Sequence, residues 1–333
     1  MHFHILLNFL WKNWTRIITY LFLFLSIILL WLFHYHQIND FFIRREKYQT
    51  ITVRDINGEN SGLVPPFLNI VSDYMAVPDY RLAGCGIRKS MSQLTVNFMC
   101  MLLNTERYEQ SGQSLNDTWM TRSTCVFNGE FTKLDEKDKA KYAKFAFVRD
   151  PMDRFISFYM DKCVKEDNCY GCGEDARCVA KHSYEDLLAY SKDPHRGTPS
   201  YTVLHNAPQT WNCDFDRFFD NYTILKIGPR REERYMPIVN LSELMLIQGV
   251  PKVKVDRILK EALDADTGHA TYNSPNRHRA EEEIRNDSEI RWYVQKMYLF
   301  DYLFFNFERD MLDEQFRSAQ WTIVKQTVER KHN

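Results

Sequence analysis

The stretch KFAFVRDPMDRFISFY, residues 144–159, decides the fold because its hydrophobic period changes within a few residues. Residues 144–148 form a short apolar run typical of a buried strand. A turn follows, in which Pro151 suits the first position of a helix. Apolar residues between 155 and 163 then recur on one helical face. The sequence therefore predicts a strand–turn–helix unit, with Arg149 at the end of the strand.

A unit of the same kind precedes this stretch. Residues 80–85 (YRLAGC) predict a strand, the turn-rich residues 86–92 (GIRKSMS) follow it, and apolar residues at 94, 98, 101 and 102 have helical spacing. Further patterns predict a buried strand at 223–227, a helix opening near Ser183, and helices at 253–264 and 279–300. Alternation of strands and helices predicts an α/β fold with a central parallel sheet flanked by helices.

The first loop has the chemistry of an anion site. A strand–loop–helix turns backbone N–H groups and a helix N-terminus towards a bound anion. Lys89 and Arg88 add positive charge, and Ser90 and Ser92 add hydroxyl donors. The loop is not a Walker A motif, because Arg88 stands where that motif requires glycine. A solvated turn with two basic residues is the alternative interpretation.

The second loop offers a guanidinium. Arg149 at a strand end can bind a phosphate through two parallel hydrogen bonds, and Ser157 lies eight residues further on in the following helix. The alternative is a local ion pair between Arg149 and Asp150, with Ser157 as an ordinary hydroxyl on the helix surface.

The composition is that of a globular protein whose first 35 residues are nearly uncharged. The 333 residues include 43 basic and 44 acidic side chains, which excludes a disordered or collagen-like chain and argues against a nucleic-acid partner. Residues 1–35 contain two charges, Lys12 and Arg16, and residues 17–33 contain none. An apolar run of this length predicts a retained transmembrane signal-anchor at 17–35. A cleaved signal peptide is the alternative, but no small-x-small cleavage site follows the run.

The rest of the chain has features of a lumenal protein. All eight cysteines follow residue 84, and four N-x-S/T sequons occur, at Asn116, Asn221, Asn240 and Asn286. We therefore predict a type II membrane protein: a cytosolic tail at 1–16, the membrane span at 17–35, a stem at 36–78, a globular domain at 79–308 and a C-terminal tail at 309–333.

The cysteines predict disulfide bonds in that compartment. Four of them follow the spacing C-x5-C-x2-C-x5-C, at Cys163, Cys169, Cys172 and Cys178. A zinc knuckle fits this spacing too, although an oxidising compartment favours disulfides of undetermined pairing. Cys85 and Cys213 are predicted to be bridged or buried, and Cys100 to be a buried free thiol within a helix.

Several of these motifs together resemble one family. The pattern R-D-P-x-x-R-x-x-S-x-Y at 149–159 resembles the 3′-phosphate element of sulfotransferases that use 3′-phosphoadenosine 5′-phosphosulfate (PAPS), and the Lys89 loop resembles their 5′-phosphosulfate element. The segments 205–213 (HNAPQTWNC) and 222–228 (YTILKIG) are similar to a stretch of the Golgi carbohydrate sulfotransferases of the chondroitin and HNK-1 type. The resemblance runs from about residue 80 to about residue 308. It departs from the family at Met91, where glycine is usual, and at Gln93, where a hydroxyl is usual.

The resemblance implies a P-loop-like sulfotransferase fold in a Golgi membrane protein. It implies transfer of a sulfuryl group from PAPS to a glycan hydroxyl, with chondroitin or a related glycosaminoglycan as the first acceptor and no metal. By this resemblance Lys89 binds the 5′-phosphosulfate and the leaving oxygen, with Arg88, Ser90 and Ser92 in the same cradle. Arg149 and Ser157 hold the 3′-phosphate. Arg154 is a further candidate, whose alternative is an ion pair with Asp150 or Asp153.

The acceptor needs a general base, and two other functions stay open. His205 is the best-placed histidine by the resemblance, and Glu106 and Glu109 are alternatives. A Golgi glycosyltransferase would use a metal-binding Asp-x-Asp motif, which occurs at 214–216 and 264–266. A catalytically inactive homologue that binds PAPS or its product is the other alternative.

Overall fold

The computed structural model describes most of the chain after residue 61. The described residues are 24–26, 28, 45–55, 62–70, 74–117, 125, 134, 136–194, 197–264, 274, 276–317 and 321–331. The predicted tail at 1–16 and nearly all of the predicted membrane span at 17–35 lie outside them. Within the described residues, no helix combines the length and the apolarity needed to cross a bilayer.

The larger of the chain's two compact units, residues 51–325, contains a four-stranded sheet in the order β2-β3-β4-β5. Its strands are β2 (Tyr74–Val77), β3 (Leu82–Cys85), β4 (Ala143–Arg149) and β5 (Tyr222–Ile227). Strands β3, β4 and β5 are parallel, which confirms the three predicted strands. The central parallel sheet gains an antiparallel edge strand, because β2 joins β3 through a tight turn and is antiparallel to it. This strand comes from residues that we assigned to the stem.

Helices connect the strands and follow them. They are α2 (Ser92–Leu103), α3 (Thr105–Gln110), α6 (Glu136–Lys139), α7 (Pro151–Phe158), α8 (Ala176–Lys192), α9 (Tyr201–Asn206), α10 (Phe215–Phe218), α11 (Tyr235–Ile247), α12 (Lys252–Asp264), α13 (Arg277–Asn286), α14 (Ser288–Phe304) and α15 (Glu314–Arg317). The single helix predicted at 279–300 is two helices. The Asp287 carboxylate accepts hydrogen bonds from the N–H groups of Glu289 and Ile290, and this cap starts α14 anew.

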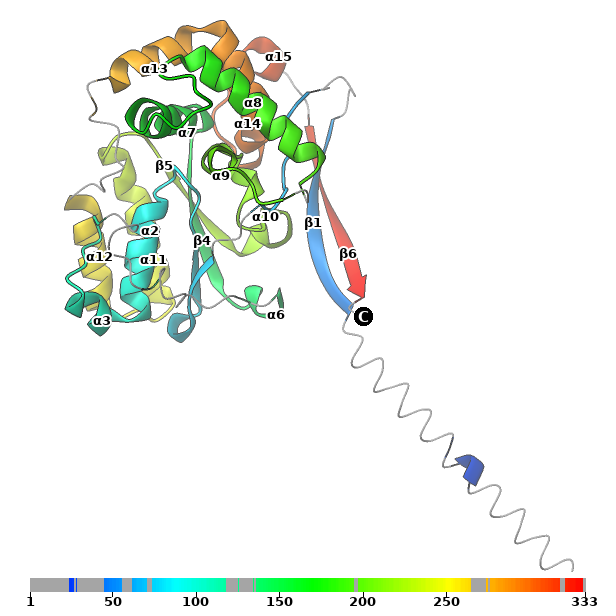
Figure 1. Ribbon diagram of the computed structural model, residues 1–333. Helices are drawn as coiled ribbons and strands as arrows, with labels where there is room; N and C mark the ends of the chain where they lie inside the picture. The colour runs from blue at the N-terminus through cyan, green and yellow to red at the C-terminus, as the bar shows by residue number, and fades with distance from the viewer. Residues whose placement is uncertain are drawn as a thin grey trace, which may run out of the picture. The chain divides into compact units, whose positions relative to one another are not determined.

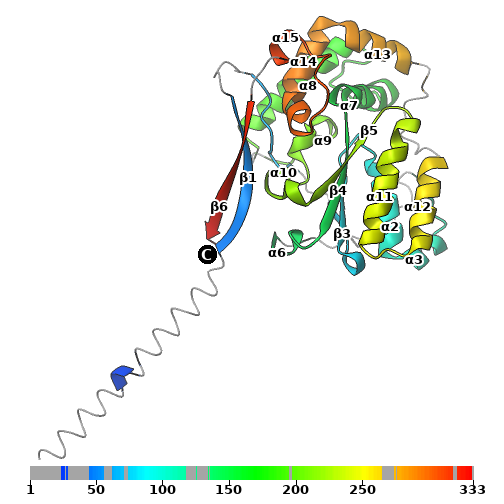
Figure 2. The ribbon, with the colours of Figure 1, turned by 180° about the vertical axis from the view of Figure 1, so that it is seen from behind.

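The two faces of the sheet pack against different layers. Phe145 and Phe147 of β4 belong to the core formed with α2, α11 and α12, whereas Ala146 and Val148 belong to a core with Phe215 and two phenylalanines of the α14 end. This alternation follows from the two-residue period of a strand. Figures 1 and 2 show α2, α11 and α12 together on one side of the strands.

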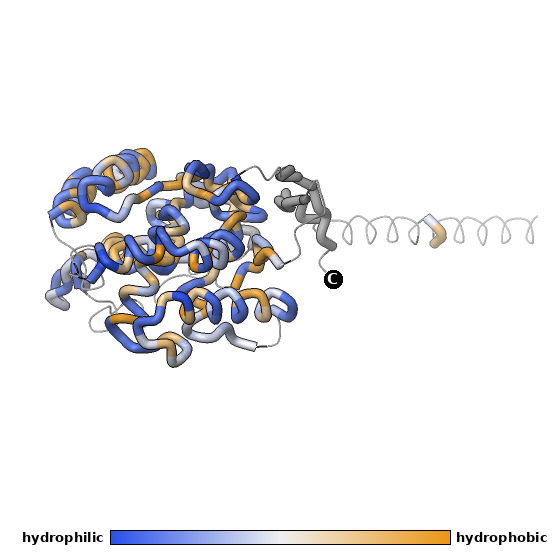
Figure 3. Tube along the Cα trace, turned by 90° about the horizontal axis from the view of Figure 1, so that it is seen from above, coloured by the Kyte–Doolittle hydropathy of each residue, from blue (hydrophilic) through white to orange (hydrophobic). Residues whose placement is uncertain are grey.

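A further core lies among α7, α8, α13 and α14. Every residue of α7 is buried, and Trp211 is among the residues that fill this core. Hydrophobic and hydrophilic residues alternate along the helices of the body in Figure 3, as expected for helices that bury one side. The buried helix α7 begins two residues after β4 ends. Arg149 therefore lies between a strand of the sheet and a buried helix, and both fix its backbone.

Four disulfide bonds are present: Cys85–Cys213, Cys100–Cys125, Cys163–Cys169 and Cys172–Cys178. The prediction of disulfides is therefore confirmed, and the prediction that Cys100 is a free thiol is wrong, since it is bonded to Cys125, 25 residues further along the chain. The thiol groups required by the zinc-knuckle alternative are all consumed by these bonds.

Residues near both ends of the chain form structure of their own. Strands β1 (Arg45–Asp55) and β6 (Trp321–Lys331) pair in a two-stranded sheet. Phe316 of α15 and Leu312 are buried against Leu299 and Tyr302 of α14. The segment expected to be a C-terminal tail thus contributes a short helix to the packing.

Candidate active site

The first candidate loop connects β3 to α2 and has a constrained backbone. Lys89 and Met91 both have positive φ angles, 67° and 57°. That left-handed conformation favours glycine, because other residues bring Cβ close to the backbone. The resemblance led us to expect glycine at the position of Met91, and the left-handed backbone there gives the physical reason for that expectation. Here the methionine side chain is partly buried against the α2 core.

Lys89 points into the protein and forms an ion pair. Its Nζ lies 2.6 Å from Oδ2 of Asp161, and both side chains are almost fully buried. Burial lowers the pKa of Lys89 to about 8, against the opposing effect of the Asp161 carboxylate. Lys89 is therefore a charged group whose proton can be lost just above neutral pH.

Gln209 joins the two candidate loops through its side chain. Its Oε1 accepts hydrogen bonds from the Ser90 hydroxyl (3.1 Å) and from the Arg149 N–H (2.9 Å), and its Nε2 donates to the Arg149 carbonyl (2.8 Å). Sequence reasoning gave this residue no role, although it lies within the 205–213 segment used for the resemblance. The structure makes it the link between the end of β4 and the loop after β3.

The short helix η3 (Gln209–Trp211) is in turn held by a buried carboxylate. The N–H groups of Gln209 and Thr210 donate to Asp301 of α14, at 2.7 and 2.9 Å. Burial raises the pKa of Asp301, and these N–H groups oppose the rise. Through Asp301, the position of Gln209 is fixed by the C-terminal half of the chain.

The Arg154 side chain forms a hydrogen bond with the backbone of the first loop. Its Nε donates to the Arg88 carbonyl at 3.0 Å, and its guanidinium lies 6.0 Å from the centre of the Tyr298 ring. The alternative of an ion pair with Asp150 or Asp153 is wrong. Asp150 caps α7 by accepting from the N–H groups of residues 152 and 153, and Asp153 pairs with Arg285.

Arg149 lies within a cluster of positive charge. Its Nε is buried without a hydrogen-bond acceptor among the described residues. Burial lowers the pKa of Arg149 to about 10, and the nearby Arg277, Arg234 and Arg154 add to this effect. Several like charges close to a buried donor are stabilised by a bound anion, which is the expected state of such a cluster.

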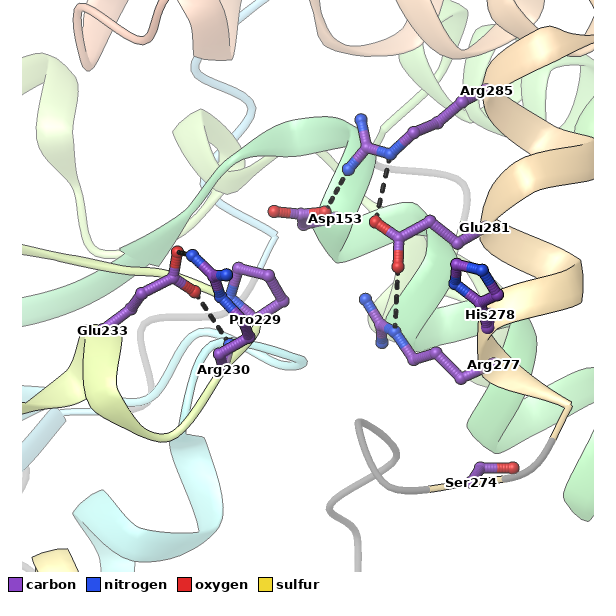
Figure 4. Close-up of a pocket in the computed structure, with 9 residues that line it drawn as sticks. All are labelled: Asp153, Pro229, Arg230, Glu233, Ser274, Arg277, His278, Glu281 and Arg285. Carbon is purple, nitrogen blue, oxygen red and sulfur yellow. Dashed lines mark hydrogen bonds and ion pairs between the residues drawn. The ribbon is translucent and has the colours of Figure 1, made fainter.

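A cavity of about 470 Å³ opens beside this cluster. Figure 4 shows its basic side chains coming from α13 and from the loop after β5, with Glu281 lying between Arg277 and Arg285. Its lining comprises Asp153, Pro229, Arg230, Glu233, Ser274, Arg277, His278, Glu281 and Arg285. Sequence reasoning missed Arg277, because nothing in the local pattern indicates that the start of α13 approaches the end of β4.

His205 of α9 lies close to the first loop. Its Nδ1 is 2.8 Å from the Tyr201 carbonyl oxygen, an acceptor, so Nδ1 carries a hydrogen and Nε2 is left as the basic nitrogen. The ring packs on that of Tyr201, with centroids 4.2 Å apart. Burial lowers the pKa of His205 to about 4, with contributions from Arg88, Lys162 and Lys89. The imidazole is neutral at neutral pH, as a general base requires.

The remaining candidates divide into two groups. Ser92 begins α2 and Ser157 is buried in α7, and in the part of the chain that the structure describes neither forms a hydrogen bond with another candidate residue. Glu106 and Glu109 are wrong as general bases. They lie in α3, beyond the 12 residues of α2, which span about 18 Å, and Glu109 pairs with Arg257.

The Asp-x-Asp motif at 214–216 is structural. Asp214 is buried and pairs with Lys139 (2.7 Å) and Arg217 (2.9 Å), and Asp216 accepts from Asn69 (2.9 Å). Carboxylates neutralised by the protein's own cations are poor ligands for a divalent metal. In the second motif, Asp264 ends α12 and Asp266 lies outside the described residues. The glycosyltransferase alternative thus loses its metal site at 214–216.

This chain belongs to the sulfotransferase family, whose sequence profile matches residues 72–308. It is 32% identical over 264 residues to the Caenorhabditis elegans carbohydrate sulfotransferase chst-1, covering 75% of this chain and 80% of that protein. It is 28% identical over 271 residues to the uncharacterized C. elegans protein C18B2.2, covering 77% and 75%. No solved structure matches the chain. The mixed α/β sheet flanked by helices fits the sulfotransferase fold, and the recognition of a carbohydrate sulfotransferase family member is confirmed.

Proposed function

We propose that the protein is a carbohydrate O-sulfotransferase that uses PAPS as donor. One observation carries this proposal. The loop after β3, which contains Lys89, and the end of β4, which contains Arg149, are joined by the side chain of Gln209, so two basic groups suited to anions lie close together. A donor with phosphates on both the 3′ and the 5′ positions of its ribose matches two such loops better than a donor with a phosphate group at one position.

The residues divide the donor between them. Lys89, with Arg88, Ser90 and Ser92, holds the 5′-phosphosulfate, and Arg149 with Ser157 holds the 3′-phosphate. Arg277, which lines the cavity beside Arg149, would contact the same 3′-phosphate. Arg154 keeps the first loop in place through the Arg88 carbonyl. All of these groups are hydrogen-bond donors, which suits a ligand composed of acceptor oxygens.

The reaction is an in-line displacement at sulfur. The acceptor oxygen forms a bond to sulfur while the bond from sulfur to the bridging phosphate oxygen breaks. The acceptor's proton passes to Nε2 of His205, and the electron pair of the broken bond stays on the phosphate, next to the Lys89 ammonium. Charge neutralisation and positioning supply the rate enhancement, as in phosphoryl transfer.

The acceptor is a glycan hydroxyl, with chondroitin or a related glycosaminoglycan proposed first. The named relative supports a carbohydrate acceptor and does not specify the sugar. We further propose a single-pass type II protein of the Golgi membrane, anchored through residues 17–35. Four disulfides and the sequons support a lumenal body.

Incubation of the full-length protein with [³⁵S]PAPS and a panel of glycans tests the proposal. Lys89→Ala and Arg149→Ala are each expected to lower transfer by about a hundredfold or more, the effect of removing one catalytic charge-stabilising donor. Lys141→Ala is the matched control, since Lys141 is a surface lysine paired, among the described residues, with Asp138, three residues before it. Transfer that survives both site substitutions refutes the assignment. Tight binding of the product adenosine 3′,5′-bisphosphate (PAP) without transfer to any glycan would favour an inactive homologue.

A further inference from the structure

Asp161 has a position that the mechanism above does not use. Its carboxylate is 1% exposed, and Oδ2 lies 2.6 Å from Nζ of Lys89 and 3.1 Å from Nζ of Lys162. One buried carboxylate is thus shared by two lysines, one of which is the proposed donor-binding residue.

The local backbone explains how Asp161 reaches the loop. Residues Tyr159–Lys165 form a π-helical segment, η2, that continues directly from α7. A π-helical turn contains more residues than an α-helical turn, so the side chains after Tyr159 are rotated from the positions that α7 would give them. Such segments are rare and are often found at functional sites. Here the rotated segment directs Asp161 and Lys162 towards the Lys89 loop.

Lys162 is itself held by further partners. Its Nζ lies 2.5 Å from Oε1 of Glu166, whose Oε2 accepts from the Tyr201 hydroxyl at 3.1 Å. Tyr201 is the residue whose carbonyl orients His205. The contacts of η2 therefore extend from the donor-binding lysine to the proposed base.

The charges around Lys89 come from four elements. Arg88 lies on its own loop, Arg149 on β4, Asp161 and Lys162 on η2, and the titratable His205 on α9. Among these groups Asp161 carries the negative charge, and the others are positive or neutral. Lys89 therefore depends on Asp161 to keep its proton in a buried and otherwise positive environment.

We propose that Asp161 is the positioning residue of Lys89: it holds the ammonium in its charged form at the donor loop until the phosphosulfate replaces it as partner. Lys162 then keeps the released carboxylate neutralised. This inference rests on the proposed function, in which charged Lys89 receives the leaving phosphate oxygen. It predicts that Asp161 sets the highest pH at which transfer proceeds.

The pH profile of kcat/KM for PAPS tests this, because it reports groups of the free enzyme. Activity of the wild type is expected to fall above about pH 8, the pKa of Lys89. Asp161→Asn removes the charge that favours the ammonium, so this alkaline limb moves down by about one pH unit or more. Above pH 8 the ratio of wild-type to variant kcat/KM approaches about tenfold for each pKa unit lost. Asp161→Glu keeps the charge and is expected to restore most of the limb.

Lys162→Met provides a test in the opposite direction. It removes a positive neighbour of Lys89 and the competitor for Asp161, so the limb moves to higher pH. Glu185→Gln is the matched control, because Glu185 is an exposed residue of α8 that pairs with His182, so its loss leaves the limb in place to within a few tenths of a unit. A loss of activity by the same factor at every pH in Asp161→Asn, or a limb that Lys162→Met leaves unmoved, overturns the inference.

Labelling of Lys89 separates this inference from the proposed function. Brief acetylation with acetic anhydride, read by peptide mass at a series of pH values, gives the pKa of Lys89 in the donor-free protein. The midpoint is expected near pH 8 in the wild type, lower in Asp161→Asn and higher in Lys162→Met. These shifts in a protein without transferase activity would refute only the proposed function, whereas equal midpoints in an active enzyme would refute only the role of Asp161.

Discussion

Gln209 is the side chain whose removal tests the architecture of the site most directly. It is 0% exposed and makes three hydrogen bonds, two through Oε1 and one through Nε2. Gln209→Ala removes all three and leaves the N–H and carbonyl groups of Arg149 without that partner. At about 1 kcal/mol for each bond, with a further cost for unsatisfied buried groups, the free energy of unfolding should fall by about 3–5 kcal/mol.

Donor binding should weaken as well. Without Gln209 the side chain of Ser90 and the end of β4 are no longer held before the ligand arrives, and binding has to order both. Ordering two such groups costs about 1–3 kcal/mol, which corresponds to roughly 5- to 150-fold weaker binding. Urea unfolding measures the first effect, and calorimetric titration with PAP measures the second.

Gln110→Ala is the matched control for this pair of measurements. Gln110 is exposed, bonds only to Glu106 among the described residues, and should change stability by no more than about 0.5 kcal/mol. If Gln209→Ala costs no more than the control, the three hydrogen bonds do not hold the site. If stability falls while PAP affinity is unchanged, Gln209 is a core residue and does not link the two halves of a donor site.

Three further predictions concern the arginine cluster, His205 and the long-range disulfide. Arg277→Gln should weaken PAP binding by about tenfold or more while leaving 5′-AMP binding nearly unchanged, because Arg277 faces the proposed 3′-phosphate. The control is Arg279→Gln, two residues further on, whose side chain is 72% exposed. Equal losses of affinity for both ligands in Arg277→Gln would contradict this placement. Partial burial lowers the pKa of His205 to about 4, so between pH 6.5 and 4 the unfolded chain binds a proton that the folded chain does not. The contribution of this residue to stability therefore falls as pH falls. Urea unfolding at pH 5 and pH 7 should show less acid sensitivity in His205→Gln, and an unchanged difference would argue against a neutral imidazole with a lowered pKa. Replacing Cys85 and Cys213 by alanine opens a bridge across a sequence separation of 128 and should lower the free energy of unfolding by about 4–5 kcal/mol, whereas the same stability with and without the bridge would show that the pair is not oxidised in the folded protein.

The sequence predicted those elements of the fold that leave a short-range pattern of residue types. The apolar run at 144–148, followed by Arg-Asp-Pro, predicted both β4 and the start of α7, because a buried strand and a helix N-terminus each leave a short-range signature. The same reasoning placed Lys89 and Arg149 at the carboxyl ends of two parallel strands. Neighbouring parallel strands end on the same edge of a sheet, so the two loops had to be close.

Sequence reasoning failed where the partner is far away along the chain. Residues 74–77 were assigned to the stem, and only their pairing with β3 decides that they form a strand. Cys100 reads as a helical thiol until Cys125 is folded against it. The alternative for Arg154 paired it with Asp150 or Asp153, its neighbours in sequence, yet its Nε donates to the carbonyl of Arg88, 66 residues away.

The sequence by itself determined the family and the two strand–loop–helix units that carry the proposed donor-binding residues, because these depend on residue types at fixed local spacing. Only the tertiary structure decided what holds those loops and tunes their charge. Gln209 bridges them across 119 and 60 residues, Arg277 adds charge to the end of β4, and Asp161 pairs with Lys89 across 72 residues. Hydrogen bonds and charge interactions act over a few ångströms of space, and a chain brings such groups together only when it folds.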